Sequence, residues 1–513
     1  MKRVLHKIKL SATKLYQWLE FSSETDIALL TLIISLYVFR MAIPFLKWLL
    51  IPVLAFVILY ALIKVIATGH NTLVTLLPNL RWFVPFGLVI LFFIIGFLRS
   101  SIISPFIITE MLNIAVIFII LLLLLLFVKD INDYEVFKKK IASSFLTFAT
   151  VISIFGLIKF FYLMKGITFD VLMVSNKYPW GSSLMQDYNF FSLGVLLGVG
   201  VIVFYYFRRR NPLLHVIFYH AAFLIMFYNV AWSGSRRGFL ALIFFIMAML
   251  LFRVVMFFKK ERVKHANLIH NINILLLTAG FSIVLATYFF KYYPHEKKDR
   301  IIASLKLDEK TTKLEVTKIT YRHLHSLNLG KGINVWYEEL WGYNYFHPEE
   351  NRFIPKDKKA FSNEVEDLLQ NEKSKIHHSR IDRWYFAITL YMKNYNPTEK
   401  IFGKGFDYLY EFKENYSETE NLEEISDYPH NSILSAFLYS GLLGGIVYLL
   451  FLAQVIVVYL NHRKALLMLL PLFLFVLFFA LVSGNSIFSI PVFAIFSILP
   501  IHYAYINKHA AIE

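Results

Sequence analysis

The chain has 513 residues, of which 58% are hydrophobic and 17% charged, and its mean hydropathy is +0.57. A soluble globular protein of this length is excluded, because such chains are far less apolar. The chain contains no cysteine, which excludes a disulfide framework and thiol chemistry. The formal net charge of +17 requires an explanation in membrane terms or in terms of a nucleic-acid partner.

Residues 1–25 are basic, and their apolar side chains recur at helical spacing, so we predict an interfacial helix on the inner leaflet. Apolar segments follow that are long enough to cross a bilayer as helices. The first has no small-residue cleavage site and is expected to remain as a signal anchor. We predict twelve spans: 26–43, 47–67, 82–98, 106–128, 141–163, 190–207, 213–232, 238–258, 272–290, 431–460, 465–483 and 486–507.

Lysine and arginine set the expected orientation. With the N-terminus inside, the inner loops hold 20 of these residues and the short outer loops hold five, or seven if Arg40 and Lys47 at span edges are counted. Because basic residues concentrate in cytoplasmic loops, both termini should lie inside. Spans one to nine then occupy 26–290, an outer cap occupies 291–430, and spans ten to twelve with a short cytoplasmic tail occupy 431–513.

The cap carries 22 Lys and Arg against 24 Asp and Glu, so the rest of the chain carries a net charge of +19. The basic excess therefore anchors inner loops to anionic lipid, and no nucleic-acid partner is expected. Within the cap, 377–394 has the periodicity of an amphipathic helix, with Arg380, Trp384, Ala387, Ile388 and Tyr391 on one face. Asn396-Pro397 should end that helix, and Gly403 and Gly405 should form a tight turn.

The segment Ser233-Gly-Ser-Arg-Arg-Gly238 joins the apolar stretches Leu213–Trp232 and Phe239–Phe258. The expected topology places Arg236 and Arg237 on the outer face, where basic residues are disfavoured in short loops. An arginine pair retained there indicates an anionic partner, and a lipid-linked diphosphate is the anion expected at that face. The alternative is that these side chains reach the outer lipid headgroups.

The order of short motifs resembles the bacterial O-antigen ligase and O-antigen polymerase family over roughly residues 180–460. The matching residues are Asn189; Ser233, Ser235 and Arg236; Arg380 and Trp384 with Gly403 and Gly405; and His430 and Asn431 with Gly441 and Gly444. Two positions depart from the family pattern, which often has an acidic residue where this chain has Tyr439 and proline where it has Tyr188. The resemblance implies an inverting, metal-independent transferase with a glycosyltransferase C-type helical membrane fold. It also implies an undecaprenyl-diphosphate-linked donor, the bacterial inner membrane, and an active site facing the periplasm.

The residues themselves suit that chemistry. Transfer of a sugar from a lipid diphosphate requires charge stabilisation on the leaving group, and arginine binds phosphate oxygens bidentately. It also requires a base for the attacking hydroxyl, and histidine titrates in the appropriate range. We predict Arg236 and Arg380 for the first role and His430 for the second. Substrate-binding roles are predicted for the remaining candidates, which are Arg237, Arg383, Ser233, Ser235, Asn189, Asn431 and Trp384.

Several alternatives remain open at this stage. Arg380 is one candidate for the essential cap arginine and Arg383 is the other, while Asn431 is also suited to capping span ten. Gly441 and Gly445 favour close helix packing. No metal site and no cofactor are predicted, because the only closely spaced aspartates in a short loop, Asp130 and Asp133, should face the cytoplasm. The acceptor is a lipid A core or protein hydroxyl for a ligase, or another lipid-linked glycan for a polymerase, and a lipid-linked glycan flippase is the alternative from another class.

Overall fold

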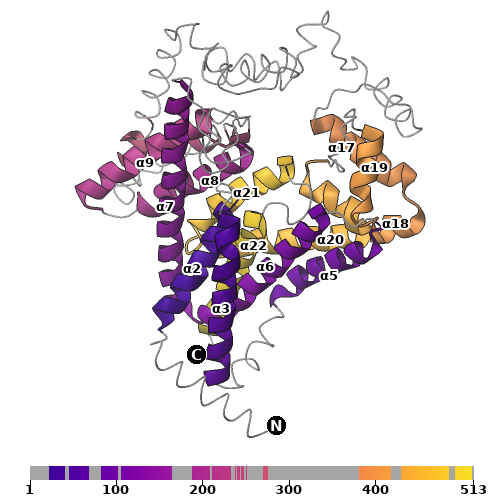
Figure 1. The fold of residues 1–513 in the computed structure, drawn as a ribbon, viewed down its shortest axis with the longest axis horizontal. Helices are drawn as coiled ribbons and strands as arrows, with labels where there is room; N and C mark the ends of the chain where they lie inside the picture. The colour runs from indigo at the N-terminus through magenta and orange to yellow at the C-terminus, as the bar shows by residue number, and fades with distance from the viewer. Residues whose placement is uncertain are drawn as a thin grey trace, which may run out of the picture.

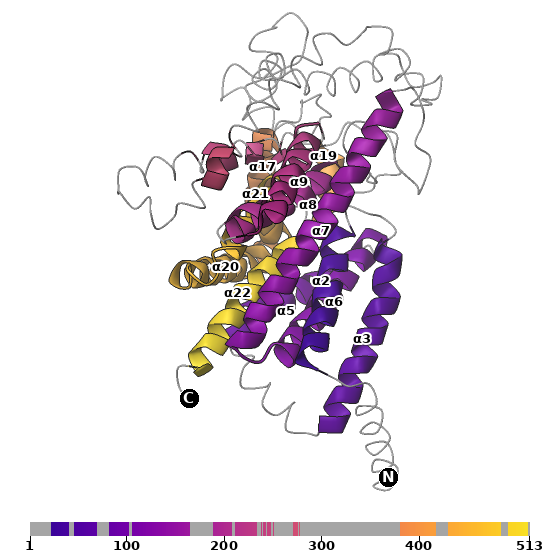
Figure 2. The same cartoon turned by 90° about the vertical axis from the view of Figure 1, so that its left-hand side faces the viewer.

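The computed structural model describes residues 22–40, 46–68, 82–101, 105–164, 188–207, 211–232, 380–416, 429–483 and 491–510, with short pieces between 237 and 276. This part of the chain is helical and contains no strand. Figures 1 and 2 show its arrangement from two directions. The helices are α2 (Ser23–Phe39), α3 (Leu46–Thr68), α5 (Val84–Arg99), α6 (Pro105–Phe127), α7 (Ile131–Met164), α8 (Tyr188–Val201), the π-helical η3 (Ile202–Tyr206), α9 (Leu213–Trp232), α17 (Arg380–Thr389), the π-helical η5 (Leu390–Asn394), α18 (Pro397–Phe402), α19 (Asp407–Tyr416), α20 (Ser432–Asn461), α21 (Leu469–Ser483) and α22 (Pro491–Ala510).

The described helices coincide with ten of the twelve predicted spans, while 238–258 and 272–290 fall largely outside the described residues. Six helices in the described part are long and apolar enough to cross a membrane, and two apolar helices, Val84–Arg99 and Leu469–Val482, are shorter. The all-helical membrane-protein class is therefore confirmed. The count of twelve spans, the orientation and the position of the cap remain predictions.

The bundle is built around α8, whose side chains are buried from Phe191 to its end at Val201 against α7, α9 and α21. Small residues allow this packing: a Cβ atom on Gly198 would overlap Ala149 of α7 and crowd Met226 of α9. Polar contacts also join helices in the described part of the chain. Asp26 of α2 is buried, and it pairs with Lys64 and accepts the Tyr60 hydroxyl at 2.7 Å, which joins α2 to α3.

A second packing unit combines α5 with α20. Their aromatic side chains meet, with the ring centres of Phe86 and Phe451 5.4 Å apart, and the amide of Gln454 donates to the main-chain carbonyl of Trp82 at 2.9 Å. Helices α17, α18 and α19 pack onto this unit, and Figure 1 shows them together beside the ends of α5 and α20. The segments that carry most of the described site candidates therefore rest on α5 and α20.

Candidate functional site

Residues 380–416, called here the cap base, form α17, η5, α18 and α19 in succession. The helix predicted over 377–394 is confirmed from Arg380 to Asn394, although its last turn is π-helical. Its buried face differs from the predicted one, since Phe386, Ala387 and Leu390 are buried whereas Ile388 is 51% exposed. Phe386 packs edge-on against Phe412 of α19, with ring centres 4.9 Å apart, and this contact turns the helix toward the rest of the cap base.

A short loop, Gly403-Lys404-Gly405, connects α18 to α19. Before it, Asn396 and Glu399 form a capping box that begins α18, as their N–H and side-chain contacts of 2.9 Å show. Gly403 and Gly405 have φ of 75° and 61°, a backbone region that glycine enters without steric cost. The predicted tight turn is confirmed.

The loop binds a break in α20. At Gly441 the helix has φ 67° and ψ −164°, which interrupts its hydrogen-bond ladder. The carbonyl of Leu438 instead accepts the Lys404 N–H at 3.2 Å, and that of Tyr439 accepts the Gly405 N–H at 2.9 Å. A Cβ atom on Gly441 would overlap the carbonyl of Ile401, so the predicted close helix packing at this glycine is confirmed, and its partner is α18 of the cap base.

Tyr439, at the position where a family acid is common, is a packing residue here. Its ring stacks on Phe93 of α5 at 4.8 Å and meets Phe406 edge-on at 4.8 Å, and its hydroxyl donates to the Phe93 carbonyl. The neighbouring Ser100 hydroxyl accepts the Phe406 N–H at 2.8 Å. The cap base is thus fastened to α5 as well as to α20.

His430 and Asn431 immediately precede α20. The side-chain oxygen of Asn431 accepts the N–H groups of Ile433 and Leu434 at 3.0 and 3.1 Å, so its role as the cap of this helix is confirmed. His430 is partly buried and has φ 56°. Among the described residues it alone combines a side chain with a positive φ, a conformation that costs of order 1–3 kcal/mol and must be held by its surroundings.

The remaining candidates are distributed over three segments. Arg380 begins α17, Arg383 and Trp384 are partly buried in its first turns, and Asn189 is partly buried at the start of α8. Arg237 is partly buried in a short described piece. The structure brings α17, the first helix of the cap base, into contact with α20. Ser233, Ser235 and Arg236 lie outside the described residues, so their relation to the others remains a prediction.

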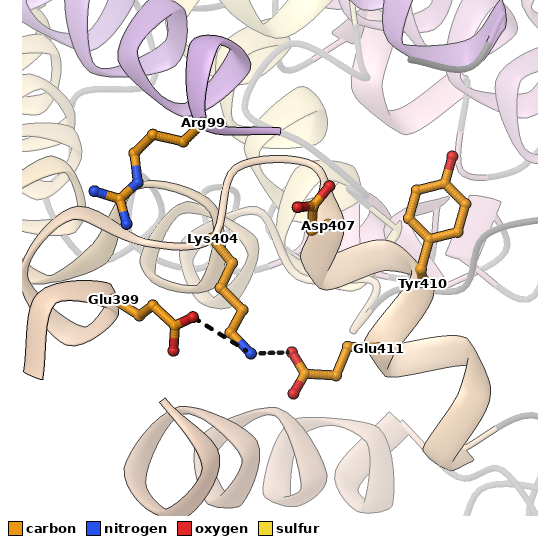
Figure 3. A pocket seen from close by; sticks show the side chains of 6 residues that line it. All are labelled: Arg99, Glu399, Lys404, Asp407, Tyr410 and Glu411. Atoms are coloured by element: carbon orange, nitrogen blue, oxygen red, sulfur yellow. Dashed lines mark hydrogen bonds and ion pairs between the residues drawn. The ribbon is translucent and has the colours of Figure 1, made fainter. Parts of the chain in front are cut away.

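Sequence reasoning missed a polar pocket of about 430 Å³ between the last residue of α5 and the cap base. Figure 3 shows its lining, with Arg99 from α5 and the other five side chains from the cap base. The ammonium of Lys404 lies 2.9 Å from Glu411 and 3.7 Å from Glu399, and Arg99 lies 5.9 Å from the centre of the Phe402 ring. The alternation of charges in the loop and its flanking helices is the only sequence signal for it.

The charged groups of this pocket already form ion pairs and hydrogen bonds within the protein. Lys404 bridges two carboxylates, and both oxygens of Asp407 accept the main-chain N–H of Ser101. The pocket therefore belongs to the joint between α5 and the cap base.

Comparison with known protein families gives a match for part of the chain. Residues 221–449 match the family model described as O-antigen ligase. This range contains the part of α9 from Ala221 onward, the cap base and the part of α20 that includes the break at Gly441. No curated protein and no solved structure matches the chain. The match confirms the resemblance that the motifs indicate.

Proposed function

We propose, from the match of residues 221–449 to the O-antigen ligase family model, that this membrane protein is a glycosyltransferase that moves a glycan from undecaprenyl diphosphate to an acceptor hydroxyl. The reaction takes place at the periplasmic face of a bacterial inner membrane. The acceptor is the lipid A core or a protein hydroxyl, as for a ligase, and a second lipid-linked glycan would instead make the protein a polymerase.

The observation that carries this proposal is the backbone of His430. Strained side-chain-bearing residues persist where the surroundings hold them, and they cluster at active sites. Asn431 holds this one, because its cap on α20 fixes the chain one residue further on. A histidine held just before the N-terminus of a helix in this way is suited to accept a proton at a defined position.

The reaction is a single displacement. The acceptor oxygen attacks the anomeric carbon of the donor while His430 removes the proton from that hydroxyl. The bond from the anomeric carbon to the diphosphate oxygen breaks, and the diphosphate leaves on undecaprenol with its negative charge. Attack opposite the leaving group inverts the anomeric configuration. General-base assistance of this kind contributes about 10²–10⁴-fold.

Arginine stabilises the leaving group. Arg236 and Arg380 bind the diphosphate oxygens, with Arg383 as the alternative on the first turns of α17. Each charge-assisted hydrogen bond contributes about 1.5–3 kcal/mol, and it raises the rate when it is stronger in the transition state than in the ground state. These guanidinium groups take the part that a metal ion plays in other transferases, so the reaction is metal-independent.

The test is transfer by the purified protein in liposomes that contain an undecaprenyl-diphosphate-linked glycan. Separate reactions supply a lipid A core acceptor, a protein acceptor, or no acceptor other than the donor, and mass spectrometry identifies the product. A His430→Gln variant is the control for the base. Product on the lipid A core or on protein identifies a ligase, and elongated lipid-linked glycan identifies a polymerase. Donor that is moved across the bilayer without covalent transfer would contradict the proposal and indicate a flippase.

A further inference from the structure

Helix α20 consists of two parts that meet at Gly441. The part from Ser432 to Ser440 follows His430, and the part after Gly441 continues to Asn461. An unbroken helix would use the Leu438 and Tyr439 carbonyls for its own ladder. Here the cap base takes both of them, through the N–H groups of Lys404 and Gly405.

A third bond completes this junction. The hydroxyl of Tyr395, at the end of η5, donates to the Leu438 carbonyl at 3.0 Å. The Tyr395 side chain is buried, and burial together with the nearby Glu411 carboxylate holds the pKa of its phenol well above its ordinary value. The hydroxyl therefore remains a donor at neutral pH. We call these contacts the clasp, defined as Tyr395, the loop 403–405 and residues 438–441.

We propose that the clasp is a positioning device that sets the arginines of α17 relative to His430, with Tyr395 and Gly441 as its positioning residues. This inference rests on the proposed function, since it concerns how the same site is aligned. Neither residue is placed in contact with the donor or the acceptor.

A small tilt at the clasp would move the arginines of α17 relative to His430. Both candidate groups sit at the far ends of helical segments that begin at the clasp, since α17 and η5 run from Arg380 to Asn394 and α20 runs from Ser432 to the break. Fifteen residues at about 1.5 Å each make a helical arm of roughly 20 Å, so a tilt of about 5° at the clasp moves its end by nearly 2 Å. A misplacement of about 1 Å can cost 10²-fold in rate.

The glycine geometry indicates that this junction is closely fitted. A Cβ atom on Gly403 would overlap the Tyr439 carbonyl, and one on Gly441 would overlap the Ile401 carbonyl. The two backbones are therefore in direct contact, with no side chain between them to absorb a shift. Any side chain introduced here moves the cap base relative to the start of α20.

A matched pair of tyrosines separates positioning from simple stabilisation. The hydroxyl of Tyr391 donates to the Lys400 carbonyl at 2.6 Å, a bond that lies wholly within the cap base. Tyr391→Phe removes one hydroxyl from η5 and Tyr395→Phe removes one from the residue that follows it, but only Tyr395→Phe removes a bond across the clasp. Gly441→Ala is a stronger perturbation of the same junction.

The relative placement of the two arms is measured directly. The chain has no cysteine, so Met392→Cys on η5, which is 60% exposed, and Leu434→Cys on the part of α20 before the break, which is partly exposed, allow a pair of spin labels. Pulsed electron–electron double resonance should give a narrow distance distribution in the otherwise unchanged protein and in Tyr391→Phe. The distribution should broaden or shift in Tyr395→Phe and Gly441→Ala.

Activity is measured on the unlabelled variants in the transfer assay. Tyr395→Phe should lower kcat by about tenfold or more, with the donor KM within about twofold and the dependence of rate on pH unchanged, because the substitution leaves the proposed base in place. Tyr391→Phe should stay within about twofold in both constants. Equal behaviour of the two Phe variants, or a broadened label distance with an unchanged kcat, would overturn the positioning role. Absence of transfer by the unsubstituted protein would refute the proposed function instead, and the positioning role with it, even if the labels still showed an intact junction.

Discussion

The main-chain N–H of Ser101 donates to both carboxylate oxygens of Asp407, at 2.9 and 3.0 Å, and the Ser101 hydroxyl donates to the same group at 2.8 Å. These residues are 306 positions apart in the chain. Asp407 is the first residue of α19, where a carboxylate is also favoured by the helix dipole. The contact thus joins the cap base to the end of α5, next to the bond from the Phe406 N–H to the Ser100 hydroxyl.

The first prediction concerns topology. A cysteine introduced at Asn371 or at Arg237 should react with an impermeant maleimide in intact spheroplasts, because both positions are expected on the outer face. A cysteine at Asn211, between η3 and α9, should react only after the membrane is permeabilised. The reverse pattern would place the candidate site in the cytoplasm and would contradict the proposed reaction.

The second prediction concerns the diphosphate. Arg236→Ala and Arg380→Ala should abolish transfer, and Lys at either position should restore little, because an ammonium cannot reproduce the planar fork of a guanidinium. Arg237→Ala and Arg383→Ala should have milder effects. Initial rates at saturating donor measure this. Near-normal turnover in both Lys variants would indicate that these arginines only anchor the protein to headgroups.

The third prediction concerns His430. His430→Ala and His430→Gln should lose transfer and still bind the lipid-linked donor, because the imidazole acts on the acceptor hydroxyl. The wild-type rate should rise with pH over the range in which imidazole loses its proton, about pH 6–7. His430→Gly should also be inactive, yet at least as stable to heat in detergent as His430→Ala, since glycine adopts φ 56° without strain. Full activity of His430→Ala would remove the proposed base.

The fourth prediction concerns metal ions. EDTA should leave the rate of transfer unchanged, because guanidinium groups are proposed to neutralise the leaving diphosphate. The measurement compares initial rates before chelation, after it, and after readdition of Mg²⁺ or Mn²⁺. A loss in EDTA that either ion reverses would contradict the metal-independent reaction.

The fifth prediction concerns Lys404 in the pocket of Figure 3. Lys404→Met should lower the melting temperature in detergent, because it removes the cation that lies between Glu399 and Glu411. The double variant Lys404→Met with Glu411→Gln should recover part of the loss, since it relieves the repulsion between the two carboxylates. A double variant less stable than the single one would show that this repulsion is not the cause.

Sequence periodicity located most of the described helices because a span in lipid must satisfy its backbone internally and present apolar side chains, which leaves a long uninterrupted signal. The turn at Gly403 and Gly405 and the cap by Asn431 were also predictable, since each depends on the chemistry of one or two local residues. The break in α20 was not, because Gly441 lies inside an apolar run and its conformation depends on a partner about 40 residues away. The contact of Asp407 with Ser101 depends on tertiary structure in the same way.

The family match ends before the contacts between α20 and α5 do. The family match ends at residue 449, inside α20, whereas Phe451 and Gln454 of that helix bind Phe86 and Trp82 near the start of α5. The matched range is therefore shorter than the packing unit that α5 and α20 form. A fragment limited to 221–449 would expose the faces that α5 and the rest of α20 cover, and we expect it to be cleared by membrane proteases. Grafting this region onto another protein would require α5 to be carried with it.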